Sequence, residues 1–81
     1  MLIELTEYLV KSIVKDSESV TVKEFPSDNE EEIIIEVLVS NDDMGRVIGK
    51  SGKIANALRI LVQASSYLQD NKRVKINIEG F

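Results

Sequence analysis

Residues 32–39 constrain the fold more than any other part of the chain, because apolar side chains fall on both faces of an extended segment. β-Branched residues dominate this segment, which favours a strand. One face is wholly apolar and the other partly so: the first carries Ile33, Ile35, Val37 and Val39, and the second carries Ile34, Glu36 and Leu38. A strand that is apolar on both faces is typical of a central position, so the segment predicts a sheet with a neighbouring strand on each side.

Two other segments alternate with the same period and are predicted to be those neighbours. Residues 19–25 precede a Pro-Ser-Asp-Asn turn at 26–29, and this short connection predicts an antiparallel hairpin with 32–39. Residues 73–79 are predicted to pair with 32–39 in parallel, because the connection between them is long and contains two predicted helices. The residues expected on the inner face of this last strand are Val74, Ile76 and Ile78.

Apolar residues recur at helical spacing in residues 2–15 and 53–69 and predict amphipathic helices, with a short helix at 41–48 between them. The expected buried stripes are Leu2, Leu5, Leu9 and Ile13 in the first helix, and Ile54, Leu58, Leu61, Ser65 and Leu68 in the longest. The predicted fold class is therefore α+β, in the order α-β-β-α-α-β, with a three-stranded mixed sheet and helices packed on one face. We expect a single domain over residues 1–81.

The residue types that are missing argue against several classes of function. The 81 residues include no cysteine and no histidine, so the chain lacks a thiol nucleophile, the commonest general base and the commonest transition-metal ligand. We therefore expect no enzyme activity, no cofactor, no metal and no small-molecule substrate. No apolar run approaches the about 20 residues of a membrane span, or the core of a signal peptide, so we expect a cytoplasmic protein without membrane contact.

The charge of the chain is distributed unevenly. The net charge is −4, yet residues 1–43 carry a charge of −9 and residues 44–81 a charge of +5. This asymmetry predicts an anionic partner for the second half. It also predicts that the first half repels nucleic acid, which would confine binding to one side of the molecule.

A glycine-containing loop, Gly-Lys-Ser-Gly at residues 49–52, separates the last two predicted helices. Residues 45–51 resemble a nucleotide-binding P-loop, but that motif needs four residues between its glycines and this segment has three. A helix cap followed by a tight turn would also explain the glycines. The lysine and serine between the glycines, with Lys53 directly after them, favour a loop that binds phosphate.

Residues 45–59, Gly-Arg-Val-Ile-Gly-Lys-Ser-Gly-Lys-Ile-Ala-Asn-Ala-Leu-Arg, resemble the fingerprint of a KH domain, in which Val/Ile-Ile-Gly-x-x-Gly joins two helices. The helix and strand that precede this unit correspond to the type II arrangement. Over essentially its whole length the chain is similar to the small bacterial single-KH proteins of the KhpA family. One departure from the general KH pattern is Ala55, where many KH domains carry a larger aliphatic residue, and Ile54 is expected to take that packing role.

The resemblance implies a non-catalytic domain that binds single-stranded RNA and clamps its phosphates at the G-x-x-G loop. The bases are expected in a groove between residues 53–69 and 32–39. The predicted RNA-binding residues, in the loop, beside it or on the rim of the groove, are Arg46, Val47, Ile48, Gly49, Lys50, Ser51, Gly52, Lys53 and Arg59.

A second apolar stripe on the longest helix consists of Ala57, Ile60, Ala64 and Tyr67. Either the first helix covers this stripe, or it is a surface for self-association or for a protein partner. The resemblance implies a homodimer that also pairs with a larger KH-containing protein of the KhpB (Jag or EloR) type. It further implies an RNA chaperone or post-transcriptional regulator linked to cell elongation, cell shape and peptidoglycan homeostasis. The competing interpretation is a protein-interaction adaptor in which RNA binding is incidental.

Overall fold

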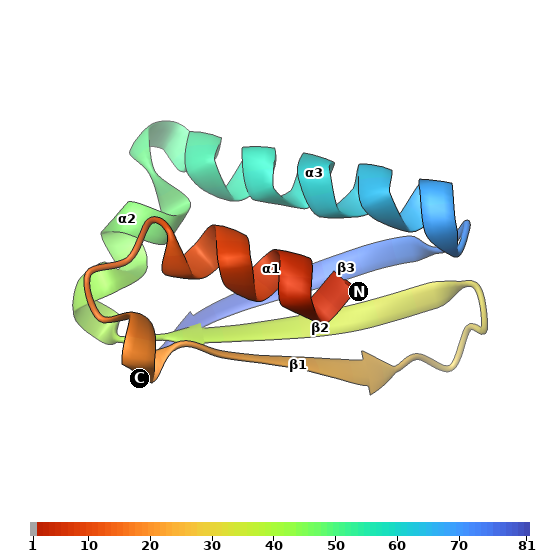
Figure 1. Ribbon diagram of the computed structural model, residues 1–81, viewed down its shortest axis with the longest axis horizontal. Coiled ribbons are helices and arrows are strands. Elements are labelled where there is room, and N and C mark those ends of the chain that lie inside the picture. The colour runs from red at the N-terminus through yellow and green to blue at the C-terminus, as the bar shows by residue number, and fades with distance from the viewer. Residues whose placement is uncertain (1) are drawn as a thin grey trace.

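The computed structural model describes residues 2–81, and its elements follow the predicted order (Figure 1). The helices and strands are α1 (Leu2–Lys11), β1 (Thr21–Pro26), β2 (Glu32–Val39), α2 (Met44–Ile48), α3 (Lys53–Gln69) and β3 (Arg73–Gly80). Short 3₁₀ turns occupy Ser17–Ser19, Asn41–Asp43 and Lys50–Gly52. Both β2 and α3 have the bounds that their sequence patterns predict.

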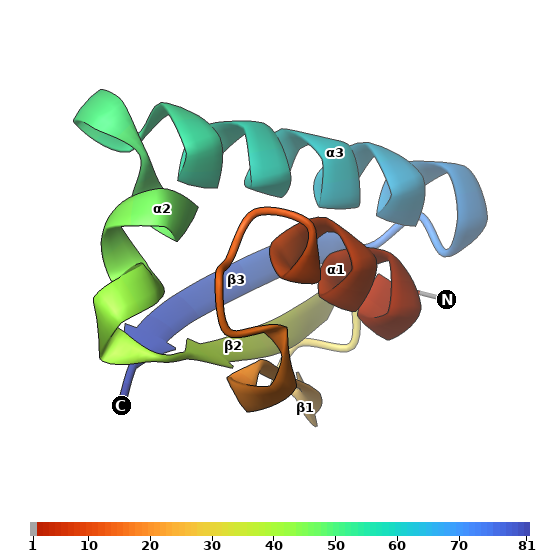
Figure 2. The same ribbon diagram turned by 60° about the vertical axis from the view of Figure 1, so that its left-hand side comes forward.

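The strands form one mixed sheet in the order β1-β2-β3, with β2 at its centre. β2 pairs antiparallel with β1 and parallel with β3, as predicted, and Ile35 in β2 lies between Glu24 of β1 and Ile76 of β3. α1 and α3 cover one face of the sheet and leave the other face bare (Figures 1 and 2). The predicted α+β fold is therefore confirmed.

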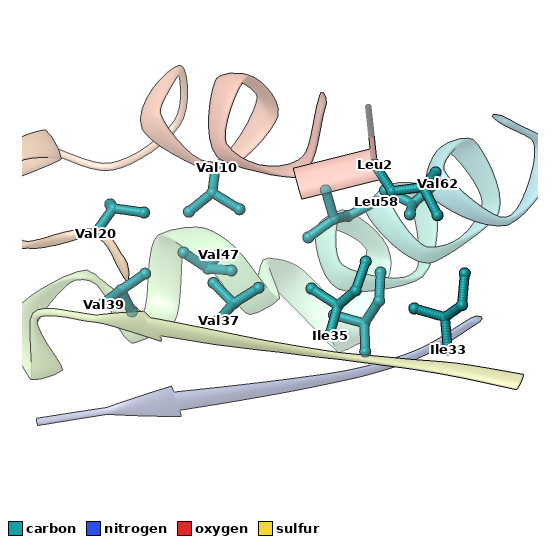
Figure 3. Close-up of a cluster of buried hydrophobic side chains, with 11 residues drawn as sticks. Leu2, Val10, Val20, Ile33, Ile35, Val37, Val39, Val47, Leu58 and Val62 are labelled. Atoms are coloured by element: carbon teal, nitrogen blue, oxygen red, sulfur yellow. The ribbon is translucent and has the colours of Figure 1, made fainter. Parts of the chain in front are cut away.

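The hydrophobic core fills the space between the sheet and the helices (Figure 3). Every second residue of β2 is buried against the helices, as the alternation predicts. Each of the helices α1, α2 and α3 contributes one fully buried valine to this cluster: Val10, Val47 and Val62. The short helix α2 is thereby fixed to the core, and the loop that follows it begins from a fixed point.

The first helix ends earlier than predicted, at Lys11 rather than near residue 15. Farther along the chain, the backbone amides of Lys15 and Asp16 donate hydrogen bonds to the carboxylate of Asp43, at 3.1 and 3.0 Å. These donors serve a tertiary contact instead of a further helical turn. The helix boundary therefore depends on a residue distant in the sequence.

The buried face of α1 also differs from the predicted stripe. Leu2 is buried as predicted, whereas Leu5, Leu9 and Ile13 are only partly buried. Thr6 takes an innermost position, because its hydroxyl donates a hydrogen bond to the carbonyl oxygen of Leu2, at 2.7 Å.

β1 and α2 both begin later than predicted, because a short 3₁₀ turn precedes each of them. β1 begins at Thr21 rather than at residue 19, because residues 17–19 form such a turn. The predicted helix over 41–48 likewise opens with a 3₁₀ turn, and only Met44–Ile48 is α-helical.

The face that α3 turns toward the core is rotated from the predicted one by roughly 100°, the step of one residue around a helix. The buried residues of α3 are Ala55, Leu58, Val62 and Ser66. Of the predicted stripe only Leu58 is buried; Leu61 and Leu68 are 53% and 88% exposed. That prediction is therefore wrong for most of its residues.

Polar contacts in the second half of α3 explain this rotation. The Ser66 hydroxyl and the Gln63 side-chain amide both donate hydrogen bonds to the carbonyl oxygen of Lys72, at 2.7 and 3.0 Å. The side-chain oxygen of Gln63 accepts a hydrogen bond from the backbone amide of Val74, at 2.9 Å. These bonds tie α3 to the start of β3 and turn its leucines outward.

Candidate nucleic-acid interface

The loop between α2 and α3 is a tight turn with positive φ angles. Gly49, Ser51 and Gly52 have φ of 75°, 57° and 76°. Glycine adopts this region without strain, whereas serine occupies it at a cost. The prediction that residues 49–52 interrupt the helix is confirmed.

Gly49 is required by the packing of the loop itself. A Cβ atom at this position would lie 2.9 Å from the backbone nitrogen of Ile54 and would collide with the Ile54 side chain. Ile54 thus packs against Gly49 and is 40% exposed, while Ala55 is 4% exposed. The expectation that Ile54 takes the core position is wrong, because α3 presents Ala55 to the core.

Gly52 is different, because the space beside it is open. A Cβ atom added there would meet no atom within 4 Å. Gly52 is the N-cap of α3, and glycine has no side chain that could cap the first turn. Amides of the first helical turn carry the positive end of the helix dipole, so this open backbone is a surface that an anion can approach.

Two cations and a hydroxyl lie next to Gly52 in the chain. Lys50, Ser51 and Lys53 are all exposed. Arg46 is exposed as well, but its guanidinium is already bound: Nη1 lies 3.1 Å from Oδ1 of Asp43. The loop therefore offers a concentrated positive charge in a chain whose net charge is −4.

Other predicted RNA-binding residues lie elsewhere. Val47 is fully buried, so it positions the loop and is not available to a ligand. Ile48, at the end of α2, is 39% exposed. Arg59 lies about 9 Å farther along α3 than Lys53, in a separate hollow that Tyr67 also lines.

Asp43 is an important residue that the sequence analysis places only within the short helix predicted at 41–48. It is 2% exposed, and its carboxylate accepts hydrogen bonds from the amides of Asp16 and Lys15 and from Arg46. The two amides, with a smaller contribution from Arg46, lower the pKa of Asp43 against the opposing effect of burial. No local pattern separates Asp43 from the exposed Asp42, because the amide partners are distant in the chain.

An apolar hollow of about 130 Å³ lies between α1 and α3. Its lining residues are Leu9, Ile13, Ile54, Ala57, Leu58 and Leu61. The hollow adjoins the loop, because Ile54 packs against Gly49. Core side chains of α3 and β2 pack against each other beneath the surface, and the groove for the bases along these two elements stays a prediction.

The second predicted surface is exposed. Ile60 and Tyr67 are 68% and 53% exposed, and Ala57 and Ala64 are exposed too. Of these four, only Ala57 lines the hollow between α1 and α3. The interpretation that the first helix covers the stripe is therefore wrong.

Neither a metal centre nor a membrane span is found in the described residues. No group of acidic side chains in residues 2–81 is arranged to hold a metal ion. Within the same range, none of the helices combines the length and the apolar content that crossing a membrane requires.

A mixed three-stranded sheet with helices on one face and a G-x-x-G turn between two helices defines a KH domain. The model of the KhpA/KhpB KH-domain family matches residues 3–78, and the chain belongs to this family. The RNA-binding protein KhpA of Clostridium perfringens is 47% identical over 75 residues, which are 93% of this chain and 96% of that relative. The RNA-binding protein KhpA of Clostridium acetobutylicum is 41% identical over the same shares of both chains.

A solved structure of Era from Aquifex aeolicus, bound to GDP and AlF4−, shares the fold with a TM-score of 0.70. The similarity covers 99% of this chain but only 30% of the Era chain. At 18% identity, it shows a common fold and nothing further.

Proposed function

We propose that the chain is a non-catalytic RNA-binding protein that holds the phosphates of single-stranded RNA at the loop between α2 and α3. The observation that carries this proposal is the open backbone at Gly52, at the positive end of α3, between the exposed lysines Lys50 and Lys53. Similar proteins are named RNA-binding proteins, which supports RNA as the anion. We regard residues 1–81 as one KH domain, of which Met1 lies outside the described residues.

In this proposal, a small number of groups in and next to the loop contact the phosphates directly. Lys50 and Lys53 supply charge, while the Ser51 hydroxyl and the first amides of α3 supply hydrogen bonds. A loop of this kind clamps about four nucleotides. With about two to four phosphates engaged, the logarithm of the affinity falls with the logarithm of salt concentration at a slope of about −0.7 per contact.

The bases are proposed to lie in the hollow between α1 and α3, which begins at Ile54 beside the loop. Its lining is aliphatic, and aromatic residues make up only 5% of the chain. Base stacking on aromatic rings therefore contributes little, and low sequence selectivity is expected.

The charge distribution directs RNA to one end of the molecule. The connection between β1 and β2, which carries Glu30 and Glu31, lies at the end of the sheet remote from the loop (Figure 1). Its negative charge repels a phosphate chain, whereas the lysines of the loop attract it. RNA is thus proposed to approach the loop end only.

The test is the binding of a short fluorescent single-stranded RNA to the wild type and to a Lys50→Asp, Ser51→Asp double variant. Loss of binding in the variant, with an unchanged circular dichroism spectrum, is the expected result. A matched control is Thr21→Asp, Lys23→Asp, which makes the same change in net charge at exposed positions of β1, away from the loop. This control should bind RNA nearly as the wild type does.

Equal loss in both double variants would contradict the loop as the site, because only the overall charge would then matter. A second candidate function is that of a protein-interaction adaptor, which the exposed apolar side chains of α3 favour. If the wild type binds no RNA but still associates with itself or another protein, the adaptor interpretation replaces the RNA-binding one.

The proposal includes self-association at the surface of Ala57, Ile60, Ala64 and Tyr67, and a KhpB-like protein as a further partner. The exposure of this surface and the family's joint description of KhpA and KhpB support both. An Ile60→Asp variant that sediments at the same mass as the wild type would contradict the surface. A cytoplasmic role as RNA chaperone or post-transcriptional regulator, linked to cell elongation and peptidoglycan homeostasis, completes the proposal on family resemblance alone.

A further inference from the structure

The side chain of Asp43 does not make the contact that is usual at its position. Asp43 is the N-cap of α2, where an aspartate ordinarily accepts a hydrogen bond from an amide of the first helical turn, and no such bond is formed. The carboxylate binds instead to the segment after α1, which passes beside α2 (Figure 2). Oδ1 accepts a hydrogen bond from the amide of Lys15 at 3.1 Å, and Oδ2 accepts one from the amide of Asp16 at 3.0 Å. A local helix cap is thus replaced by a contact between distant segments.

This contact is the hydrogen-bonded link between the segment after α1 and α2. Among the described residues, no other hydrogen bond joins residues 12–16 to residues 40–48. A polar hollow of about 370 Å³ lies beside the contact, so close packing does not replace it there. Asp43 itself is 2% exposed, which shields its hydrogen bonds from competition with water. The relative position of the two segments therefore depends on this carboxylate as well as on the core.

The two linked segments belong to different parts of the proposed RNA site. Ile13, two residues before Lys15, lines the apolar hollow from the side of α1. On the other side of the contact, α2 ends at Ile48 and leads directly into the G-x-x-G loop. Asp43 thus connects one wall of the hollow to the loop that is proposed to hold phosphate.

We propose that Asp43 is a positioning residue for RNA, which holds the α1 wall of the apolar hollow in a fixed place relative to the G-x-x-G loop. The phosphates and bases of one strand are covalently joined, so both can bind together only if the two parts of the site keep their separation. A wall that is fixed before binding spares the entropy of ordering it during binding. This inference deepens the proposed function and rests on it, because the loop and the hollow are the two parts of that site.

The test compares two strands of equal length and charge: a short fluorescent single-stranded RNA, and an abasic strand with the same backbone. The wild type should bind the RNA more tightly, and the ratio of the two dissociation constants measures the contribution of the bases. Asp43→Asn replaces one acceptor oxygen by an NH2 group, so one of the two amides loses its partner. This variant should lower the ratio about threefold to tenfold, the cost of ordering roughly one side chain on binding.

Two control variants separate the amide contacts of Asp43 from its charge and from its ion pair. Asp42→Asn removes the same charge at the adjacent exposed position and should leave the ratio unchanged. Arg46→Gln removes the ion pair but keeps both amide contacts, so it should change the affinity for the two strands by the same factor. A ratio lowered as much by Arg46→Gln as by Asp43→Asn would overturn the proposal, because the effect would then act through the guanidinium.

Hydrogen exchange in the wild type provides a measurement that does not depend on the folding of Asp43→Asn. Because coupling is reciprocal, bases in the hollow should stabilise the contact of Asp43 with the segment after α1. Saturation with RNA should therefore slow the exchange of the Lys15 and Asp16 amides more than saturation with the abasic strand does. Equal exchange with the two strands would overturn the proposal.

Failure of this inference can be told apart from failure of the proposed function. Equal affinity of the wild type for the two strands, or a ratio that Asp43→Asn leaves unchanged, would overturn the positioning role of Asp43 while phosphate binding at the loop stands. A wild type that binds neither strand would overturn both.

Discussion

Asp43 and Arg46 are joined by a hydrogen bond of 3.1 Å between an exposed guanidinium and a carboxylate that is almost completely buried. The same carboxylate accepts the backbone amides of Lys15 and Asp16. One side chain thus anchors the segment after α1, the start of α2 and a cation next to the G-x-x-G loop. The position of that loop depends on this contact as well as on the core residue Val47.

We expect Asp43→Asn to lower the unfolding temperature at neutral pH. The amides of Asp16 and Lys15 lower the pKa of Asp43 below its ordinary value of 3.8. A group with a lowered pKa stabilises the fold fully above its pKa in the unfolded chain, and this contribution is lost as the pH falls through the folded value. The difference between wild type and variant should be largest near neutral pH and shrink below about pH 4.

Thermal melts followed by circular dichroism, from neutral pH to about pH 2.5, measure this difference. Asp42→Asn is the matched control. This substitution removes the same charge at the adjacent position, where the side chain is exposed. Asp43 would have no special role if both variants showed the same melting temperature at every pH.

Substitution of three glycines by alanine should distinguish the free-energy cost of a steric collision from that of a positive φ angle. Gly49→Ala should destabilise the domain by about 2–4 kcal/mol, because it adds a collision with Ile54 to a positive φ. Gly52→Ala, with a positive φ but open space, should cost about 1 kcal/mol. Gly45→Ala, inside α2 and free of contacts, should be neutral or stabilising by about 0.5–1 kcal/mol. Urea unfolding measures all three, and equal effects at the three positions would contradict this interpretation.

The orientation of α3 is tested by two alanine substitutions. Val62→Ala removes two methyl groups from a fully buried site and should cost about 1–3 kcal/mol. Leu68→Ala removes more apolar surface but at a residue that is 88% exposed, so its effect should stay within about 0.5 kcal/mol. If chemical denaturation showed a larger loss of stability for Leu68→Ala than for Val62→Ala, the buried stripe predicted from the sequence would be correct instead.

That stripe illustrates how far the sequence determines the structure. The alternation of β2 and the bounds of α3 could be predicted, because both follow from local spacing of apolar residues. The rotation of α3 could not, because the hydrogen-bond partners of Gln63 and Ser66 are Lys72 and Val74, which lie outside the helix and do not enter its periodic pattern. The same holds for Asp43, whose amide partners belong to a distant segment.

The candidate site, too, could be predicted from the sequence only in part. The family fingerprint identifies the loop and its lysines, and the structure leaves Lys50 and Lys53 exposed and the space beside Gly52 open. The fingerprint does not show that Val47 is inaccessible or that the apolar hollow lies beside α1. Both depend on the packing of α1 and α2, which local spacing does not encode.

Salt dependence should distinguish a phosphate contact from a remote cation. Lys53→Gln is expected to reduce the magnitude of the salt slope of RNA binding by about 0.7. Arg59→Gln removes the same charge from α3 but in a separate hollow, and should leave the slope unchanged. Fluorescence anisotropy titrations over a series of salt concentrations measure both variants. Equal slopes for Lys53→Gln and the wild type would remove Lys53 from the phosphate clamp.

The hydrogen bonds of Gln63 also have a consequence for assembly. β3 is an edge strand, and an edge can recruit further strands without limit, which is how fibres grow. Gln63 occupies the Val74 amide at the beginning of that edge, and Lys75 and Glu79 place charge along the strand. At the opposite edge β1 ends in Pro26, which has no amide to donate. Both edges of the sheet therefore carry residues that hinder the addition of a further strand, so the sheet itself does not lead to open-ended growth.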